Sequence, residues 1–365
     1  MAAKLNFFRW LATSVAALGV MSVIGGTGLA QSTWTGATST AWGTAGNWSG
    51  GVPVASGTAI LSGTNTGNRY ALSLPAVGTN ALALLQVNAG NSAYSTNTNA
   101  LNLAEGGAIN NSRKTTSGGP GFTAGNLVLT GSTASVGGSG YSKLNSVSTT
   151  SGDIPALLTL TTGSTQVVAT TDVSLQANSG STLVTNGSTL GDVTIKNGAV
   201  LTAVAGQYLN TDFNALVLES TAKTVVNIGY ADQTTMVSDT YAPATITYGG
   251  ELSLNMAGVG GDLFESWSSS QIFLGAKSGS FSSVTLANAD APYTGLTFGR
   301  VGSEWVSGTF AGFNGETQWL VFSETNGNLV VVPEPSTIVF AGVGVAMAGW
   351  SAWKKRRLSK VLVKS

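Results

Sequence analysis

The stretch DVSLQANSGSTLVTNGSTLGDVTIKNGAVLT, residues 172–202, contains four short apolar bursts separated by small polar residues and glycine. In Val173-Ser174-Leu175 and Val193-Thr194-Ile195, apolar and polar residues alternate, as in a strand with one buried face. Asn-Gly and Ser-Gly pairs separate the bursts, and these residues accept the positive φ of tight turns. The stretch therefore predicts short β-strands joined by tight turns.

Bursts of this kind continue on both sides of the stretch. Counted from Val173, apolar starts recur near residues 183, 193, 200, 216 and 225, in steps of 10, 10, 7, 16 and 9 residues. The pattern predicts strands over residues 126–130, 157–161, 172–176, 181–184, 192–196, 199–202, 215–218 and 244–248. The polar stretch 91–99 is predicted to be a protruding loop.

Strands at this spacing permit two architectures, a β-sandwich or jelly roll of hairpins and a parallel β-helix in which each strand stacks on its equivalent one coil later. The strands often have only three apolar positions, and small polar residues recur at the turns with little change. Both observations favour the solenoid. We therefore expect an all-β, right-handed parallel β-helix over residues 31–257, with the sandwich as the alternative.

The C-terminal end carries a tripartite signal. Pro333-Glu334-Pro335-Ser336-Thr337 precedes a charge-free stretch, residues 338–353, and then Lys354-Lys355-Arg356-Arg357. The prolines favour an extended, accessible segment, and the 17 residues from Thr337 to Trp353 would span about 25 Å as a helix, short for a bilayer core. The four cations are expected to stay cytoplasmic.

This tail resembles the PEP-CTERM sorting signal of Gram-negative bacteria. The resemblance implies a single transmembrane helix and an exosortase-like membrane protease or transpeptidase that recognises Pro333, Glu334 and Pro335. It divides the tail into a sorting signal over 333–357, with Lys354, Lys355, Arg356 and Arg357 as the membrane stop, and a cytoplasmic end over 358–365. An ordinary tail anchor is the alternative.

The N-terminus has the pattern of a secretory signal peptide over residues 1–30. Lys4 and Arg9 precede an apolar run, residues 10–24, and Gly28-Leu29-Ala30 supplies the small residues that signal peptidase reads. We expect cleavage between Ala30 and Gln31. The chain is therefore expected to cross the inner membrane, to be anchored there transiently by its tail, and then to reach the cell surface or the medium.

Three tryptophans lie near the expected mature N-terminus, in Trp34-Thr35-Gly36, Trp42 and Asn47-Trp48. Together with a Pro-containing turn at Pro53, they resemble the opening of autotransporter-like passenger proteins, which implies an N-terminal cap over 31–63. Large aromatic side chains can cover the apolar end of a first coil that has no neighbour. A sugar-binding platform of the same tryptophans is the alternative, and the cap is favoured.

Residues 258–332 are richer in aromatic side chains and are expected to form a C-terminal β capping segment. Gly279-Ser280-Phe281 and the run Asn328-Leu329-Val330 resemble the C-terminal segment of passenger-type PEP-CTERM proteins. Asn326-Gly327 between β-forming residues predicts a tight hairpin turn.

Composition excludes several classes of function. Histidine and cysteine are absent, which removes Ser-His-Asp and Cys-His nucleophilic sites, histidine and thiolate metal sites, and disulfides. Residues 31–332 contain 8 lysines and arginines against 15 aspartates and glutamates, a formal charge of −7 without a basic stripe. Nucleic-acid binding, which needs such a stripe, is not supported.

Carboxylate chemistry remains open. Asp153, Asp172, Asp192 and Asp212 are spaced about 20 residues apart, so coils of that length would align them into a column for calcium or acid catalysis. Because Asp172 and Asp192 precede apolar bursts, a role as turn residues is favoured. Asp262 and Glu265 form another close pair, which we assign to the capping segment. We expect no catalytic residue, metal or cofactor.

The sequence thus predicts an exported, non-enzymatic structural or adhesive protein of the cell surface or extracellular matrix. Exosortase systems often accompany exopolysaccharide production, so the resemblance implies a matrix or biofilm polymer as neighbour. The competing interpretations are a carboxylate-dependent enzyme acting on polysaccharide and a carbohydrate-binding module, both on a β-helix.

Overall fold

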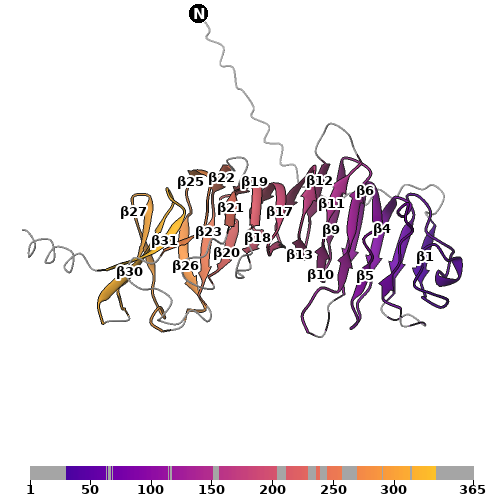
Figure 1. Ribbon diagram of the computed structural model, residues 1–365, viewed down its shortest axis with the longest axis horizontal. Coiled ribbons are helices and arrows are strands. Elements are labelled where there is room, and N and C mark those ends of the chain that lie inside the picture. Colours follow the sequence, from indigo (N-terminus) through magenta and orange to yellow (C-terminus); the bar gives the residue numbers. More distant parts are fainter. Residues whose placement is uncertain are drawn as a thin grey trace, which may run out of the picture.

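The computed structural model is an elongated stack of short strands that starts at β1 and ends in a small antiparallel sheet (Figure 1). It describes residues 30–62, 64, 67, 69–113, 115, 117–150, 156–203, 211–228, 236–238, 245–256, 269–289, 291–312 and 315–333. Every strand range predicted from the apolar bursts coincides with an observed strand to within a few residues.

Two long parallel sheets make up the body. The first, a 15-stranded sheet, has a main path of strands in chain order: β1 (Gln31–Trp34), β2 (Thr58–Leu61), β4 (Leu82–Val87), β6 (Ala100–Asn111), β9 (Thr133–Gly137), β12 (Ala156–Leu160), β15 (Val173–Ala177), β17 (Thr189–Ile195), β19 (Thr211–Leu218), β22 (Thr245–Tyr248) and β25 (Ala276–Gly279). The short strands β8 (Asn126–Leu129), β11 (Val147–Thr149), β14 (Thr170–Thr171) and β21 (Met236–Ser238) pair beside this path.

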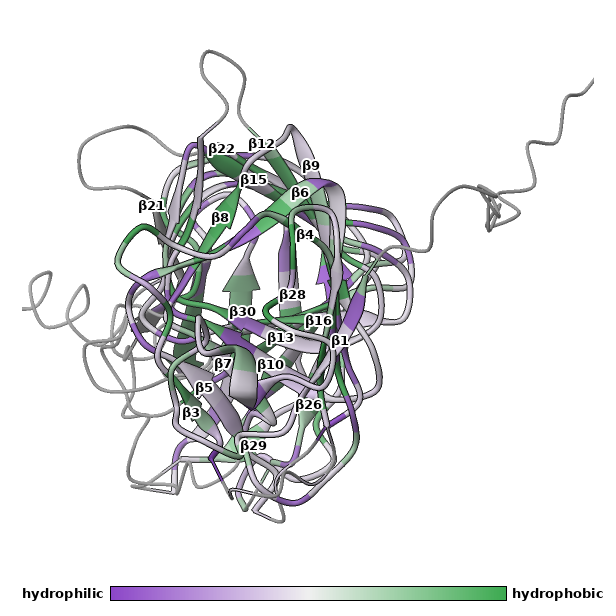
Figure 2. Cartoon of the chain, turned by 90° about the vertical axis from the view of Figure 1, so that its right-hand side faces the viewer, coloured by the Kyte–Doolittle hydropathy of each residue, from purple (hydrophilic) through white to green (hydrophobic). Residues whose placement is uncertain are grey.

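The second sheet is 10-stranded and follows the same order along the stack. Its members are β3 (Ala71–Leu72), β5 (Tyr94–Thr96), β7 (Phe122–Ala124), β10 (Tyr141–Leu144), β13 (Gly163–Val167), β16 (Ser181–Thr185), β18 (Val200–Ala203), β20 (Lys223–Asn227), β23 (Glu251–Asn255) and β26 (Ser283–Ala287). The chain therefore winds from one sheet to the other and back, which is a β-helix-like architecture. Figure 2 views the coils along the stack from the β1 end.

The register explains the irregular spacing of the bursts. Consecutive bursts belong to opposite sheets, so two of them make one coil: Leu175 pairs with Val193 across 18 residues, and Val193 with Leu216 across 23. In the second sheet, Leu183 pairs with Leu201 and Leu201 with Thr224. The strands stack regularly while the connections between them change length.

The core lies between the two sheets. Strands β12, β15 and β16 alternate strictly between buried and half-buried residues, so alternate side chains point inward. Leu158, Leu175, Leu183 and Leu201 are all fully or almost fully buried. Each such leucine contributes about 1.5–3 kcal/mol relative to an exposed position.

Polar side chains connect neighbouring coils on the outside. Lys196 forms an ion pair with Glu219 at 2.8 Å, and Lys223 one with Glu251 at 3.1 Å, each across one coil step. On the second sheet the side-chain amide of Asn255 donates to that of Asn227, with which it is in register. These contacts fix the register, while the backbone ladders and the leucine core supply most of the stability.

A small antiparallel sheet follows the last coil. Its 6 strands are ordered β24 (Ser269–Gln271), β31 (Asn328–Pro333), β30 (Thr317–Ser323), β28 (Glu304–Ser307) and β27 (Phe298–Val301), with β29 (Phe310–Ala311) paired beside β30. The predicted hairpin at Asn326-Gly327 is confirmed: β30 and β31 pair antiparallel with Ser323 opposite Asn328, and Gly327 has a φ of +73°.

Two features differ from the sequence predictions. Strands β25 and β26 lie inside the segment 258–332 but still pair parallel with β22 and β23, so the change to antiparallel pairing falls within that segment. The prediction of a loop at 91–99 is wrong, because this stretch contains β5, a strand of the second sheet whose Tyr94 is fully buried.

Helix is scarce in the described part of the chain, where the single short 3-10 turn η1 (Ala45–Asn47) occurs. None of the described residues forms a helix of the length and apolar character needed to cross a membrane. The predicted span over 337–353 lies outside the described residues.

Candidate functional site

The first residue of the predicted sorting motif belongs to the folded unit. Pro333 is the last residue of β31, is buried, and pairs with Gln318 of β30. The expectation of an accessible segment is therefore wrong for Pro333, because the proline closes a ladder. Glu334, Pro335 and the four cations Lys354, Lys355, Arg356 and Arg357 lie outside the described residues.

The predicted signal-peptide cleavage bond lies directly before the first strand. Ala30 is exposed and its carbonyl accepts a hydrogen bond from the backbone N–H of Thr58 at 3.3 Å. Gln31 is exposed, begins β1 and is in register with Thr58. Residues 1–29 lie outside the described residues.

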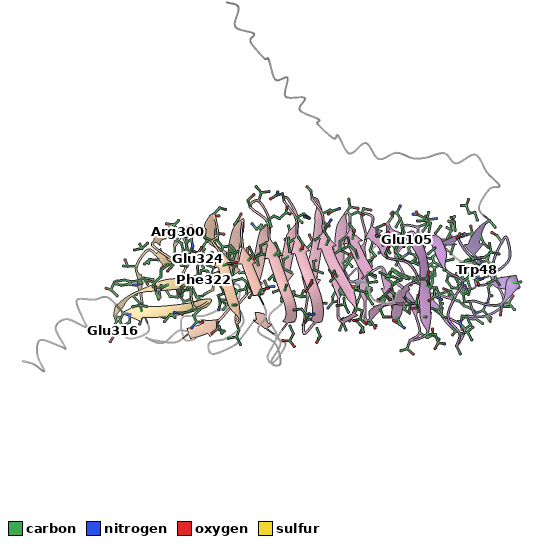
Figure 3. All side chains as sticks on the ribbon, turned by 90° about the horizontal axis from the view of Figure 1, so that it is seen from above. Trp48, Glu105, Arg300, Glu316, Phe322 and Glu324 are labelled. Carbon is green, nitrogen blue, oxygen red and sulfur yellow. The ribbon has the colours of Figure 1, made fainter. Side chains whose placement is uncertain are left out.

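The three N-terminal tryptophans pack against one another at the β1 end of the stack, where Figure 3 labels Trp48. Trp34, Trp42 and Trp48 are 0%, 1% and 5% exposed. The Trp48 ring meets Trp34 and Trp42 edge to face, with centroids 5.1 and 4.6 Å apart, and its Nε1–H donates to the Trp42 carbonyl at 2.7 Å. Buried rings cannot stack on a sugar, so this geometry favours the cap over the platform.

The aspartate column, the alternative to the favoured turn-residue role, does not form between Asp192 and Asp212. Asp192 is in register with Ala215, whereas Asp212 is in register with Thr189, because the coil after Asp192 is longer than the one before it. Asp153 lies outside the described residues, as do Asp262 and Glu265. Within the described ranges, no three potential carboxylate or imidazole ligands gather around a common point.

Asp172 has the features expected of a turn residue. Its φ is +54°, and its carbonyl accepts a hydrogen bond from Ala156 at 3.1 Å. It shares a hollow of about 210 Å³ with Asp192, Thr170 and Asn214, and Asp212 does not line that hollow. Asp172 and Asp192 thus line the same surface hollow, and Asp212 lies outside it.

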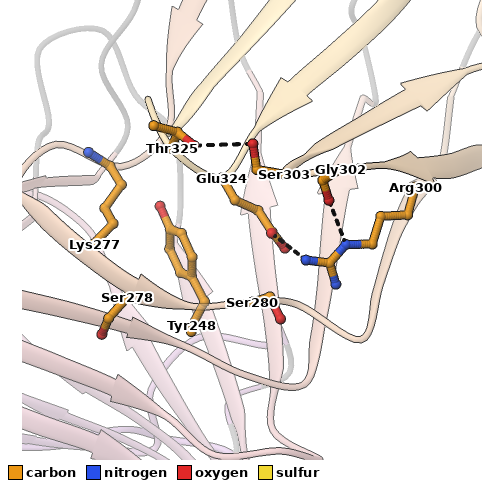
Figure 4. A pocket seen from close by; sticks show the side chains of 10 residues that line it. Tyr248, Lys277, Ser278, Ser280, Arg300, Gly302, Ser303, Glu324 and Thr325 are labelled. Carbon is orange, nitrogen blue, oxygen red and sulfur yellow. Dashed lines mark hydrogen bonds and ion pairs between the residues drawn. The ribbon is translucent and has the colours of Figure 1, made fainter.

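A larger hollow, which we call the seam pocket, lies where the last coil meets the antiparallel sheet (Figure 4). It has a volume of about 650 Å³ and is lined by Tyr248, Lys277, Ser278, Gly279, Ser280, Arg300, Gly302, Ser303, Glu324 and Thr325. Tyr248 comes from β22 and Lys277 from β25, whereas Arg300 comes from β27 and Glu324 from the β30–β31 turn. The pocket therefore depends on both parts of the fold.

Glu324 connects these two parts. Its side chain is almost fully buried, and its Oε1 accepts hydrogen bonds from the backbone N–H of Phe281 at 2.8 Å and from Trp305 Nε1–H at 3.0 Å. Its Oε2 forms an ion pair with Arg300 Nη2 at 2.9 Å. A carboxylate so buried is tolerated because each of its oxygens is paired.

Arg300 is held by several contacts of its own. Its Nε–H donates to the Gly302 carbonyl at 3.0 Å, and its guanidinium lies 5.4 Å from the Trp305 ring centroid, a cation–π contact. The Arg300 guanidinium thus contacts Glu324, Gly302 and Trp305. The charges of Arg300 and Glu324 cancel within the pocket wall.

Tyr248 presents an unsatisfied hydroxyl to the same pocket. The residue is 4% exposed and its hydroxyl has no hydrogen-bond partner. Burial, and secondarily the negative charge of Glu324, raises the pKa of Tyr248 far above its usual range, so the hydroxyl stays protonated. Leaving such a group buried and unpaired costs about 1–3 kcal/mol.

Lys277 supplies the remaining charge of the pocket. Its Nζ donates to the Gly275 carbonyl at 2.8 Å, and burial lowers the pKa of its ammonium group. None of the three ion pairs among the described residues involves Lys277. The pocket therefore combines an uncompensated cation, a buried donor and the hydroxyls of Ser278, Ser280, Ser303 and Thr325.

Among the described residues, the seam pocket lacks the carboxylate pair that glycoside hydrolysis uses. Glycoside hydrolysis uses two carboxyl groups about 5–10 Å apart, and Glu324 is the only carboxylate among the described residues that line the pocket. Its oxygens are engaged by Phe281, Trp305 and Arg300.

Sequence reasoning missed the seam pocket. One signal was available: only 9% of the residues are charged, so Glu324, which follows the apolar run Trp319–Phe322 by two residues, stands out in the hairpin. That Arg300 and Lys277 approach it depends on how the antiparallel sheet meets the last coil. Comparison of the chain with protein-family models, curated proteins and solved structures gave no match.

Proposed function

We propose that this chain is an exported, non-enzymatic structural or adhesive protein of the cell surface or extracellular matrix. In this proposal residues 1–30 form a signal peptide, 337–353 cross the inner membrane transiently, and an exosortase-like enzyme acts near Pro333-Glu334-Pro335. The coils of the body wind right-handed. Exopolysaccharide of the matrix or biofilm is the proposed neighbour.

The observation that carries the proposal is the position of Pro333. The last strand among the described residues, β31, ends at Pro333, which is also the first residue of the proposed sorting motif. Because Pro333 is buried and paired with Gln318, the segment free to enter a membrane enzyme would begin at Glu334. The proposal therefore places the action of the enzyme at the residues that directly follow this strand.

The shape of the body supports a structural role. Its two parallel sheets form a continuous stack of backbone ladders, the outward positions are mostly small and polar, and polar contacts connect successive coils. An enzyme acting on polysaccharide finds less support in the seam pocket, because Glu324 is its single carboxylate among the residues that the structure describes and is fully engaged. The pair Asp172 and Asp192, which share the smaller hollow, is the observation that this alternative would rest on.

The decisive experiment is intact-mass analysis of the protein recovered from cell-envelope and medium fractions. We expect the wild-type chain to begin at Gln31 and to lack the residues after the sorting motif. We expect a Glu334→Ala variant to retain the cationic tail in the membrane. Glu304→Ala, which removes an exposed carboxylate from β28, is the matched control and should be processed like wild type.

The result that would overturn the proposal is a wild-type chain that keeps its tail in the membrane, as the Glu334→Ala variant does. The tail would then be a permanent anchor.

A further inference from the structure

The seam pocket contains a polar group for which the folded chain supplies no partner. The Tyr248 hydroxyl is buried and unpaired, and its ring is stacked on Phe281 at 4.6 Å between centroids and packed against Phe273 at 5.1 Å. These contacts hold the ring in place. Figure 4 shows the hydroxyl directed between Lys277 on one side and Glu324 and Thr325 on the other.

The charges in the pocket favour a ligand with a single negative charge. Arg300 is neutralised by Glu324 at 2.9 Å, which leaves the Lys277 ammonium as the positive group that a ligand could meet. An ammonium has three donors, and one of them is used by the Gly275 carbonyl. A phosphate would suit this site poorly, because its second negative charge would face the Glu324 carboxylate. The Arg300 guanidinium, which could otherwise bind a phosphate, is already paired with Glu324.

The rest of the lining favours hydroxyl groups on the ligand. Ser278, Ser280, Ser303 and Thr325 line the pocket, and the hydroxyls of Ser303 and Thr325 are 3.2 Å apart. Hydroxyls both donate and accept, as do the hydroxyls of a sugar ring. The volume of about 650 Å³ lies within the range of about 300–1,000 Å³ found for small-molecule sites.

We propose that the seam pocket binds a uronic acid, a sugar whose carboxylate accepts from Lys277 and from the Tyr248 hydroxyl while its ring hydroxyls meet the serine and threonine side chains. This site goes beyond the proposed function, because its occupancy does not depend on whether the tail is cut. It gives the structural protein a defined contact with an acidic polysaccharide or with the free sugar.

The test is titration of the full chain, purified in mild detergent, with D-glucuronate, D-glucose, inorganic phosphate and a glucuronate oligosaccharide, followed by calorimetry and intrinsic tryptophan fluorescence. We expect saturable binding of glucuronate and at least tenfold weaker binding of glucose and phosphate, since each lacks either the charge or the shape that the pocket matches. Tighter binding of the oligosaccharide would identify a polymer as the source, and binding of the monomer alone would identify the free sugar.

Two variants separate binding from folding. Lys277→Met should weaken glucuronate binding by about tenfold or more, whereas Lys223→Met, which removes a paired cation outside the pocket, should not change it. Tyr248→Phe should weaken binding by about tenfold and leave the free protein at least as stable as wild type, because the hydroxyl has no partner in the folded chain.

Three results would overturn the proposal. They are the absence of saturable glucuronate binding, equal binding of phosphate, and unchanged glucuronate affinity in both pocket variants. Because none of these readouts involves the tail, failure of the pocket is distinguishable from failure of the sorting signal.

Discussion

The backbone N–H of Phe281 in the last coil donates a 2.8 Å hydrogen bond to Oε1 of Glu324 in the turn of the terminal hairpin. One side chain thereby joins the parallel stack to the antiparallel sheet. The Phe281 ring centroid lies 6.0 Å from that of Phe322, the residue two before Glu324, so aromatic packing accompanies the polar contact. This junction forms one wall of the seam pocket.

Glu324→Ala should loosen the antiparallel sheet. The substitution leaves the Phe281 amide and the Trp305 indole N–H without an acceptor and Arg300 without its counter-charge, for an expected loss of roughly 2–4 kcal/mol. Hydrogen exchange should show lost protection in residues 298–333, with the coils near β15 unchanged. Glu304→Ala is the control, with an expected change within about 0.5 kcal/mol. Equal protection in the two variants would contradict this account of the junction.

The body could be predicted from the sequence because each of its strands carries its own pattern. The alternation in Val173-Ser174-Leu175 identifies a strand with one buried face, and the turn residues on either side limit its length. The sheet to which each burst belongs follows from counting alternate bursts, as the pairing of Leu175 with Val193 shows. These signals are local, so tertiary context does not override them.

The features that sequence reasoning left open, predicted wrongly or missed depend on contacts between residues far apart along the chain. Asp192 and Asp212 look equivalent by spacing, but the coil between them is longer, and Asp212 falls opposite Thr189. Tyr94 lies in a polar stretch, for which a loop was predicted. Its ring and that of Tyr70 pack against the buried guanidinium of Arg113, and the stretch forms the strand β5 instead. Glu324 and Lys277 meet only through tertiary packing that no local pattern encodes.

Trp48→Ala should unravel the first coil. It removes a ring packed between Trp34 and Trp42, and such a truncation costs about 3–5 kcal/mol. Because each coil depends on its neighbour, the loss should appear as faster amide exchange in β1 and β2. Trp319→Ala, which removes a half-buried tryptophan from the antiparallel sheet, should leave those amides protected. Intact protection of β1 in Trp48→Ala, together with lost binding to a sugar, would support the platform instead.

Stability should fall at alkaline pH. Tyr293 is fully buried, and burial raises its pKa to about 12. Above the ordinary tyrosine pKa of about 10 the unfolded chain loses this proton before the folded chain does, so the stabilisation is complete below pH 10 and is lost as the pH rises toward 12. The expected loss is roughly 2–3 kcal/mol, measured from urea unfolding at a series of pH values.

Tyr293→Phe removes that titration, so the variant should lose less stability than wild type between pH 10 and 12. Tyr248 shifts in the same direction, and a residual alkaline decline is therefore expected in this variant. An identical pH dependence in wild type and variant would show that the Tyr293 hydroxyl is open to solvent.

Gly250 should tolerate alanine far less well than Gly180. Both have a positive φ, +65° and +81°, which costs an alanine about 1–2 kcal/mol through the backbone alone. At Gly180 the added Cβ would meet open space, whereas at Gly250 it would clash with the backbone of Ala222 in the preceding coil. The Ala222 carbonyl accepts a hydrogen bond from the backbone N–H of Glu251, and the Gly250 carbonyl accepts one from that of Ser282 at 2.7 Å. Because both backbones are held by these bonds, neither can move away from the added Cβ. We therefore expect Gly180→Ala to lower the free energy of unfolding by about 1–2 kcal/mol and Gly250→Ala to lower it by more than about 3 kcal/mol. The Gly250→Ala variant should also lose amide protection in β20 and β23.

The measurement is urea unfolding of the two variants. Equal losses of stability would mean that neighbouring coils can move apart at Gly250 without a free-energy cost.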